Sequence, residues 1–120
     1  MDVTGERRLE TCRRLIAERQ LVGQVIGFDI CPCPAWDILL DLYAAEAERR
    51  SIYLWSLSVA ANIPVSSAHR KIVELIELGL LDRAADPEDG RRVTISLAPA
   101  VGPLIEDLFD RIDALTPGGS

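Results

Sequence analysis

The sequence predicts a mainly α-helical protein with a small antiparallel β wing, a winged helix-turn-helix set between two terminal helices. The pattern around residues 65–78 is amphipathic, and Gly79 ends it, as glycine commonly does just past the last turn of a helix. Two short strands follow, at 80–84 and 93–97, and a polar tip at 86–90 joins them. Helix, strand, basic tip, strand is the order of elements in a winged helix.

The N-terminal part, residues 1–33, is predicted to be a helix and a linker. Apolar side chains recur over residues 6–28 on a face that widens toward the C-terminal half. The arginine pairs at 7–8 and 13–14 lie on the other side, where a solvated face is favoured over contact with DNA flanks. The run C-P-C-P at 31–34 then ends the helix, because its prolines are incompatible with a continuing helix.

The central part, residues 34–97, is predicted to hold the helix-turn-helix and the wing. Pro34 suits the first turn of a second helix that reaches about residue 48. A short strand at 51–54 is expected to complete the sheet of the wing. A third helix at 56–61 is followed by Asn62, which favours a turn before the amphipathic helix.

The C-terminal part, residues 98–120, is predicted to be a joint, a last helix at 103–115 and a tail. The joint at 98–102 contains a proline and a glycine, and Pro103 follows it. The stripe of the helix is regular and apolar, which indicates a buried or partner-covered face. The first and last helices together carry more apolar surface than one small lobe needs, so a two-fold homodimer is expected. Its predicted interface residues are Leu9, Ile16, Leu104, Leu108 and Ile112.

Length and composition indicate one folded domain. The chain has 120 residues, 48% of them hydrophobic, and a net charge of −6 that argues against a general polyanion binder. No apolar run is long enough to span a membrane and the start is unlike a signal peptide, so no membrane partner and a cytoplasmic location are expected. The three cysteines are an odd number, which does not suggest a secreted disulfide framework.

The pair Cys31 and Cys33 allows a thiol switch or metal ligation, but packing at a helix junction is favoured. A lone C-x-C motif without a second Cys/His pair falls short of a four-ligand metal site. A disulfide between the two would close a small, strained ring. We therefore expect no metal and no cofactor.

The outward first turn of the helix at 65–78 is small and polar. Ser66, Ser67, His69 and Arg70 project there, on the side away from the apolar stripe. A helix that enters the DNA major groove needs little bulk at its N-terminus, hydroxyl donors, and a long donor such as Arg for base edges or phosphates. An ordinary amphipathic surface helix also has a polar face, and the attached wing is what favours DNA.

The same stretch resembles the winged helix-turn-helix of the multiple-antibiotic-resistance regulator (MarR) family. The matching residues are Arg70, Glu74-Leu75, Gly79-Leu80-Leu81, Arg83 and the wing residues Asp86-Pro87-x-Asp89-x-Arg91. The resemblance implies a homodimeric transcriptional regulator that binds double-stranded DNA. It also implies that Asp89 holds Arg91 in place for the minor groove or backbone. The expected DNA-binding residues are Ser66, Ser67, His69, Arg70, Arg83, Asp89, Arg91 and Arg92.

The resemblance further implies a pocket between the winged lobe and the terminal helices, often for aromatic acids. Trp36, Tyr43, Tyr53 and Trp55 could line such a pocket, although aromatic side chains are more often simply core. The expected partners are therefore double-stranded DNA and a second copy of the chain, with a small aromatic ligand as an open possibility.

Two other classes of function are compatible with the sequence. A winged helix used for protein contact is the main alternative to DNA binding, and the negative net charge favours it. A ligand- or thiol-responsive regulator is a variant of the DNA-binding regulator. No enzyme is expected, since the chain has one histidine, no glycine-rich phosphate loop, and paired carboxylates such as Glu106-Asp107 that suit a solvated helix.

Overall fold

The computed structural model describes residues 2–115. The tail expected at 116–120 lies outside the described residues. In chain order the elements are α1 (Val3–Val25), α2 (Pro34–Ala47), β1 (Ile52–Tyr53), α3 (Leu54–Ala60), α4 (Val65–Glu77), β2 (Leu81–Ala85), β3 (Val93–Leu97) and α5 (Val101–Ala114). The protein is thus mainly helical with a small sheet, which is compatible with a winged-helix fold.

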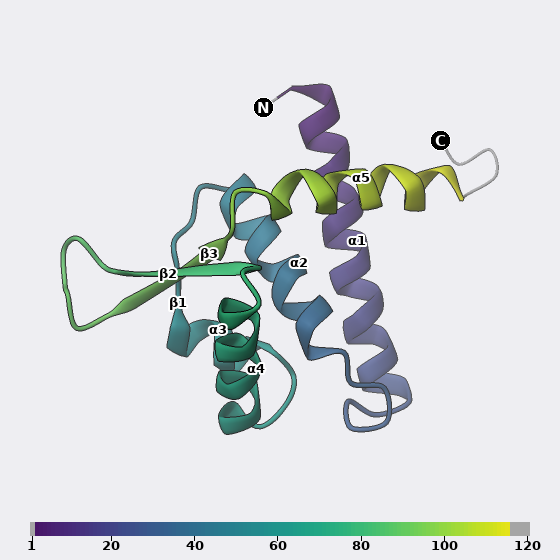
Figure 1. Cartoon of the computed structure of the whole chain (residues 1–120). Coiled ribbons are helices and arrows are strands. Elements are labelled where there is room, and N and C mark those ends of the chain that lie inside the picture. The colour runs from purple at the N-terminus through teal and green to yellow at the C-terminus, as the bar shows by residue number, and fades with distance from the viewer. Residues whose placement is uncertain (1, 116–120) are drawn as a thin grey trace.

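The sheet has three strands in the order β1-β3-β2, and both pairs are antiparallel. β3 lies in the middle, so Thr94 pairs with Tyr53 on one side and with Ala84 on the other. The expected short strand near residue 52 therefore does complete the sheet. The β2–β3 hairpin projects from the body on the side away from α1 (Figure 1).

The core forms around α2, whose buried side chains include Ile38, Leu40 and Leu42. One cluster of buried apolar residues includes Leu9 of α1, Ile72 of α4 and Phe109 of α5, so both ends of the chain share it with the middle. In Figure 1, α5 crosses α1 on the side of the molecule opposite the hairpin. Within the described residues, no helix combines the length and apolar character that crossing a membrane requires.

Several helix boundaries differ from expectation: α1 ends at Val25 and not at residue 28, and α3 begins at Leu54, where the end of a strand was expected. Two further differences have clear physical reasons. α1 begins at Val3 instead of about residue 6, because the Asp2 side chain caps it by accepting a hydrogen bond from the Gly5 amide at 2.7 Å. α5 begins at Val101, two residues before the expected start at Pro103. Proline is tolerated in a first turn because its missing amide would have no partner in the helix there.

α1 and α5 are joined by ion pairs, which corrects the expectation of a merely solvated arginine face. Arg8 Nη2 lies 2.8 Å from Asp110 Oδ2, and Arg7 Nη2 lies 3.0 Å from Asp110 Oδ1. The hydrogen bond from Arg8 holds the pKa of Asp110 below its usual value. The Thr11 hydroxyl donates to Asp113 Oδ1 at 2.9 Å. These contacts fix the angle between the two terminal helices.

Candidate nucleic-acid interface

A groove of about 900 Å³ lies between α3, the outward side of α4 and the base of the hairpin. Its lining residues are Tyr53, Leu54, Trp55, Ser56, Ser58, Val65, Ser66, His69, Arg70, Arg91, Arg92 and Val93. The chain brings these residues together from three stretches, at 53–58, 65–70 and 91–93. This happens because α4 is followed directly by the hairpin, and the hairpin pairs back onto β1.

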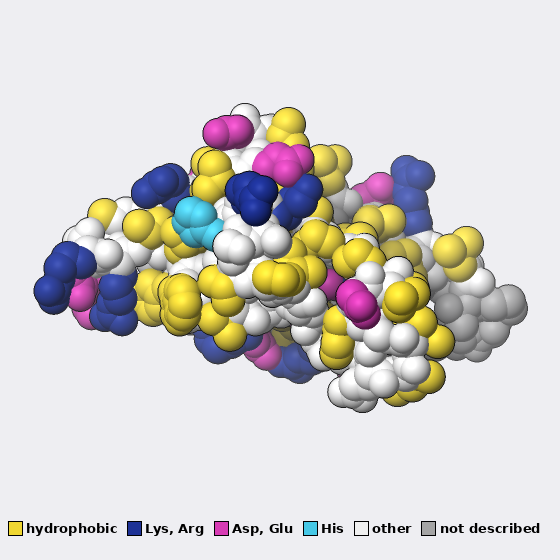
Figure 2. Space-filling model, turned by 90° about the horizontal axis from the view of Figure 1, so that it is seen from below, with side chains coloured by type: hydrophobic (Ala, Val, Ile, Leu, Met, Phe, Trp, Pro, Cys, Tyr) yellow, Lys and Arg dark blue, Asp and Glu magenta, His cyan; other side chains and the backbone are white. Residues whose placement is uncertain are grey.

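The groove is basic although the protein is acidic. Three arginines, Arg70, Arg91 and Arg92, line it together with His69, and no carboxylate is among its described lining residues. The net charge of the whole chain is −6. Figure 2 shows this face, with basic side chains at the hairpin and around the histidine near the middle. The lining of the groove is therefore locally basic, on a protein whose net charge is negative.

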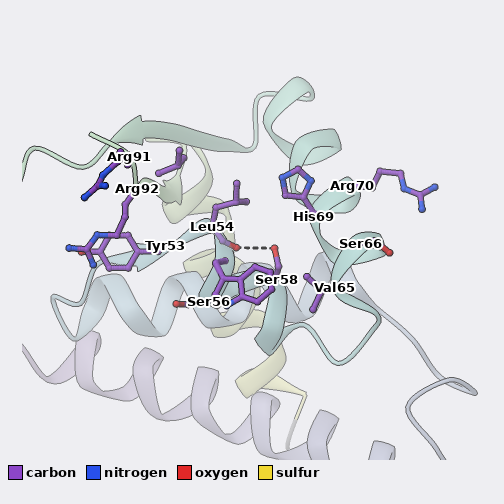
Figure 3. A pocket seen from close by; sticks show the side chains of 12 residues that line it. Tyr53, Leu54, Ser56, Ser58, Val65, Ser66, His69, Arg70, Arg91 and Arg92 are labelled. Carbon is purple, nitrogen blue, oxygen red and sulfur yellow. Dashed lines mark hydrogen bonds between the residues drawn. The ribbon is translucent and has the colours of Figure 1, made fainter. Parts of the chain in front are cut away.

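The helix α4 presents its polar residues as its amphipathic pattern predicts. Ser66, His69 and Arg70 are exposed, whereas Ala68 and Ile72 are buried against the core. His69 points into the groove and Arg70 extends away from it along the outer side of the helix (Figure 3). Ser67 is half-buried and does not line the groove. His69 and Arg70 belong to the same turn of α4 and therefore point in different directions.

The N-terminus of α4 has free backbone donors. Pro64 is its N-cap and makes no side-chain capping bond. The first turn of a helix has amide groups without partners in the helix, and its dipole places partial positive charge there. An anion could therefore bind at this end of α4.

The hairpin tip is organised by acid–base pairs. Asp89 Oδ1 accepts hydrogen bonds from the Arg91 amide at 3.1 Å and from Arg91 Nε at 3.3 Å. The pairing expected from the family resemblance is therefore present. Asp86 is buried, and the hydrogen bond that it accepts from the Glu88 amide lowers its pKa, with the Arg92 charge acting in the same direction.

Arg91 and Arg92 are held in different ways. The Arg91 side chain is 92% exposed beyond its pair with Asp89. The Arg92 guanidinium carbon lies 4.7 Å from the centre of the Tyr53 ring, and Arg92 Nε lies 3.6 Å from Asp86 Oδ2. Figure 3 shows both arginines at the same edge of the groove, beside Tyr53. Arg91 is free to reach outward, and Arg92 is anchored.

Arg83 is exposed on β2, opposite Ile95, and does not line the groove. Of the residues predicted to contact DNA, the structure brings together Ser66, His69, Arg70, Arg91 and Arg92 at the groove, supported by Asp89, and leaves Arg83 and Ser67 outside it.

The four aromatic residues expected to line a ligand pocket lie in two separate places. Tyr43 is buried, and its ring stands edge-on to Phe109 with centroids 5.0 Å apart. Trp36 makes a similar contact with Phe109 at 6.5 Å. Trp55 lies elsewhere, exposed at the groove. Trp36 and Tyr43 thus pack against Phe109, whereas Tyr53 and Trp55 line the groove, so the four side chains do not share one pocket.

Tyr43 also binds one of the acidic residues of α5, Glu106. Its hydroxyl donates to Glu106 Oε2 at 3.0 Å, so Glu106 is not simply solvated. Burial and this hydrogen bond raise the pKa of Tyr43 well above its usual value. The ring therefore stays neutral and anchors α5 to α2.

Leu9, expected at the dimer interface, is buried in the chain's own core and has little surface left for a partner. Ile16 and Ile112 are half-buried. Leu104 and Leu108 are exposed, by 66% and 40%. Leu104 and Leu108 are thus the members of the expected interface that are most open to a partner.

Cys31 and Cys33 are exposed and free, and Cys12 is buried and free. Burial raises the pKa of Cys12 to about 12, so it stays a neutral thiol that donates to the Leu40 carbonyl at 3.2 Å. Across residues 2–115, no three His, Cys, Asp or Glu side chains are grouped so that they could hold a metal ion.

A scan against protein-family models finds no match to this chain. A search of curated proteins finds no match either.

Proposed function

We propose that this protein binds double-stranded DNA as a winged helix-turn-helix. In this proposal α3 and α4 form the helix-turn-helix, and the β2–β3 hairpin is the wing. The observation that carries the proposal is the groove between them: three arginines and a histidine line it without a carboxylate, on a chain of net charge −6. Local positive charge on an acidic protein suits contact with phosphates at one defined face.

The helix α4 would enter the major groove by its first turns. Ser66 is small and exposed there, so the helix can approach the base edges closely. Arg70 extends away from the protein's own basic groove, along the outer side of α4 (Figure 3). There it could donate to guanine or to a phosphate. The free amides at the N-terminus of α4 suit a backbone phosphate.

The wing would reach the minor groove or the flanking backbone. Asp89 orients Arg91 while leaving its side chain 92% exposed, so the guanidinium can contact DNA without first being freed from the protein. Arg92 is anchored on Tyr53 and would contribute its charge to a nearby phosphate. Arg91 would thus extend to contact the DNA, and Arg92 would contact it from a fixed position.

A homodimer would present two copies of this face. Leu104 and Leu108 are exposed on α5, on the side of the molecule away from the hairpin. Covering them by the same residues of a second copy leaves both α4 helices free for DNA. Two helices spaced by one turn of DNA, roughly 34 Å, would bind a near-palindromic site. The role that the resemblance implies for such a dimer is regulation of transcription.

One observation favours the alternative, a winged helix used for protein contact. Trp55 is 69% exposed at the groove, and Val59 of the same helix is exposed too. Exposed tryptophan is enriched in protein–protein interfaces. The acidic remainder of the surface would also suit a basic protein partner.

Selection of bound fragments from the source genome separates the two functions. Fragments recovered at low and at higher salt are sequenced, and binding to a recovered duplex is compared with binding to a scrambled duplex of equal composition. DNA binding predicts a recurring near-palindrome and tighter binding to it than to the scrambled duplex. Binding to neither duplex at low salt would rule the proposal out and favour protein contact, and equal binding to both would remove the sequence preference.

A further inference from the structure

The basic groove has charged edges and a floor that is partly apolar. Arg91 and Arg92 lie at the hairpin edge and His69 at the α4 edge, with Leu54 and Ser58 of α3 between them (Figure 3). The lining also includes three further apolar side chains, those of Trp55, Val65 and Val93. A ligand that fits this groove therefore carries negative charge beside an apolar surface.

Trp55 is the apolar part of the lining that is most open to a ligand. It is 69% exposed, whereas Leu54, Val65 and Val93 are half-buried. None of the ring–ring or cation–π contacts among residues 2–115 involves Trp55. Its indole ring is therefore free to pack against a bound molecule, and its ring N–H can donate a hydrogen bond.

The path of the DNA determines what would lie over Trp55, and this step rests on the proposed function. In that function α4 enters the major groove and Arg91 reaches the adjacent minor groove or backbone. The major and minor grooves of a duplex are separated by one sugar–phosphate strand. That strand must then cross the protein between α4 and the hairpin, where Trp55 lies.

A DNA strand offers the two kinds of surface that the groove lining can bind. Its phosphates suit the arginines, since no carboxylate is among the described lining residues. Its deoxyribose lacks the 2′-hydroxyl of ribose and presents C–H groups between the phosphates. The paired bases of an intact duplex are stacked inside, so the sugar is the apolar surface that the strand turns toward Trp55.

We propose that one strand of the DNA duplex runs through this groove, with Trp55 packed against a deoxyribose and Arg92 beside a flanking phosphate. Arg92 is already held on the Tyr53 ring at 4.7 Å, so the phosphate meets a fixed charge. Trp55 then fixes the depth at which the strand lies between α4 and the hairpin. Sugars are the same in every sequence, so this contact positions the duplex without reading its bases.

Trp55 can be observed directly, because the chain has only two tryptophans. Trp36 packs against Phe109, so Trp36→Phe keeps a ring there and leaves Trp55 as the only indole. A saturating amount of a selected duplex should protect the fluorescence of this variant from quenching by acrylamide. Trp55→Phe, in which Trp36 is the only indole, should show no such protection. Unchanged quenching of Trp55 in the complex would overturn the proposal.

Trp55→Ala tests the energy of the contact, and Val59→Ala is its control. Val59 is 55% exposed on the same helix and does not line the groove. Trp55→Ala should weaken binding by about tenfold on selected and scrambled duplexes alike, as expected for loss of a large apolar contact. The dependence of binding on salt should stay as in the wild type, because no charge is lost. Trp55→Phe should retain part of the affinity, and Val59→Ala all of it.

The outcomes separate this contact from DNA binding as such. If the wild type binds the selected duplex and Trp55→Ala binds it equally well, the proposal is overturned and the indole is left for a protein partner. A loss confined to the selected duplex, or a changed salt dependence, would also overturn it, because a deoxyribose is uncharged and independent of sequence. Circular dichroism checks that each variant is folded. Failure of the proposed function would be seen separately, as absence of duplex binding by the wild type, and would remove this contact with it.

Discussion

The Arg92 guanidinium lies over the Tyr53 ring, with its central carbon 4.7 Å from the ring centre. Tyr53 belongs to β1 and Arg92 to the end of the hairpin, so the contact fastens the hairpin to the strand that leads into α3. Asp86 extends the fastening through its 3.6 Å contact with Arg92 Nε. The basic edge of the groove is thereby fixed relative to α3, and only Arg91 extends freely beyond it.

Arg92→Ala should lower the free energy of unfolding by about 0.5–1 kcal/mol, the range for an exposed cation–π contact. Arg91→Ala is the matched control: it removes the same charge from the neighbouring position, where the side chain pairs with Asp89 and is 92% exposed. Urea denaturation of the two variants measures the difference. An equal loss in both variants would show that the Tyr53 contact does not stabilise the hairpin.

The course of the chain around α4 could be predicted because single residues determine it. Gly79 has φ +81°, in the left-handed region where glycine has no steric penalty, and α4 ends just before it. Asn62, with φ +64°, makes the turn before α4, and asparagine tolerates that region better than most residues do. Such local signals are carried by the residue type itself.

The contacts between distant segments could not be predicted in this way. The Arg92–Tyr53 contact depends on the register that sets Tyr53 opposite Thr94, and nothing in either segment encodes that register alone. Trp36 and Tyr43 suit a pocket as well as the core, where aromatic side chains are more common, and residue type alone does not tell which way α2 faces. Phe109, which covers them both, lies more than sixty positions further along the chain.

Asp41→Asn should stabilise the protein at neutral and higher pH. Burial raises the folded-state pKa of Asp41 to about 6, above the ordinary value of 3.8, so the folded protein binds this proton more tightly than the unfolded chain does. Its favourable contribution is present below about pH 4 and is lost as the pH rises through about 6.

The variant should therefore gain on the order of 1–2 kcal/mol over the wild type near pH 8 and nothing near pH 4, if partial exposure of the carboxylate is allowed for. Thermal or urea unfolding at the two pH values measures this. A constant difference between the variant and the wild type across the range would contradict the raised pKa.

Leu104→Asp with Leu108→Asp should convert a homodimer into a folded monomer. Both side chains are exposed on α5, so the charges disturb a partner surface rather than the core formed by Ile105 and Phe109. Light scattering at micromolar concentration gives the mass, and circular dichroism checks the fold. Leu78→Asp is the control, because Leu78 is equally apolar and exposed but follows α4. A wild-type protein that is already monomeric would refute the dimer.

Arg70→Ala should relax sequence preference more than it weakens binding overall. If Arg70 reads a base, the substitution should cost roughly 1–3 kcal/mol on the selected duplex and little on a scrambled one. His69→Ala provides a comparison from the same turn, because His69 points into the groove and Arg70 points away from it (Figure 3). A uniform loss on both duplexes would assign Arg70 to a phosphate.

The salt dependence of DNA binding by Arg91→Ala and Arg111→Ala tests the account most directly. Both variants lose one positive charge and acquire the same net charge, but Arg111 lies on α5, paired with Asp107, outside the basic groove. Fluorescence anisotropy on a selected duplex across a salt series gives, for each variant, the slope of log binding constant against log salt concentration. Arg91→Ala should reduce the magnitude of this slope by about one, and Arg111→Ala should leave it unchanged. Equal slopes for Arg91→Ala and the wild type, or equal losses in both variants, would contradict DNA contact by the wing.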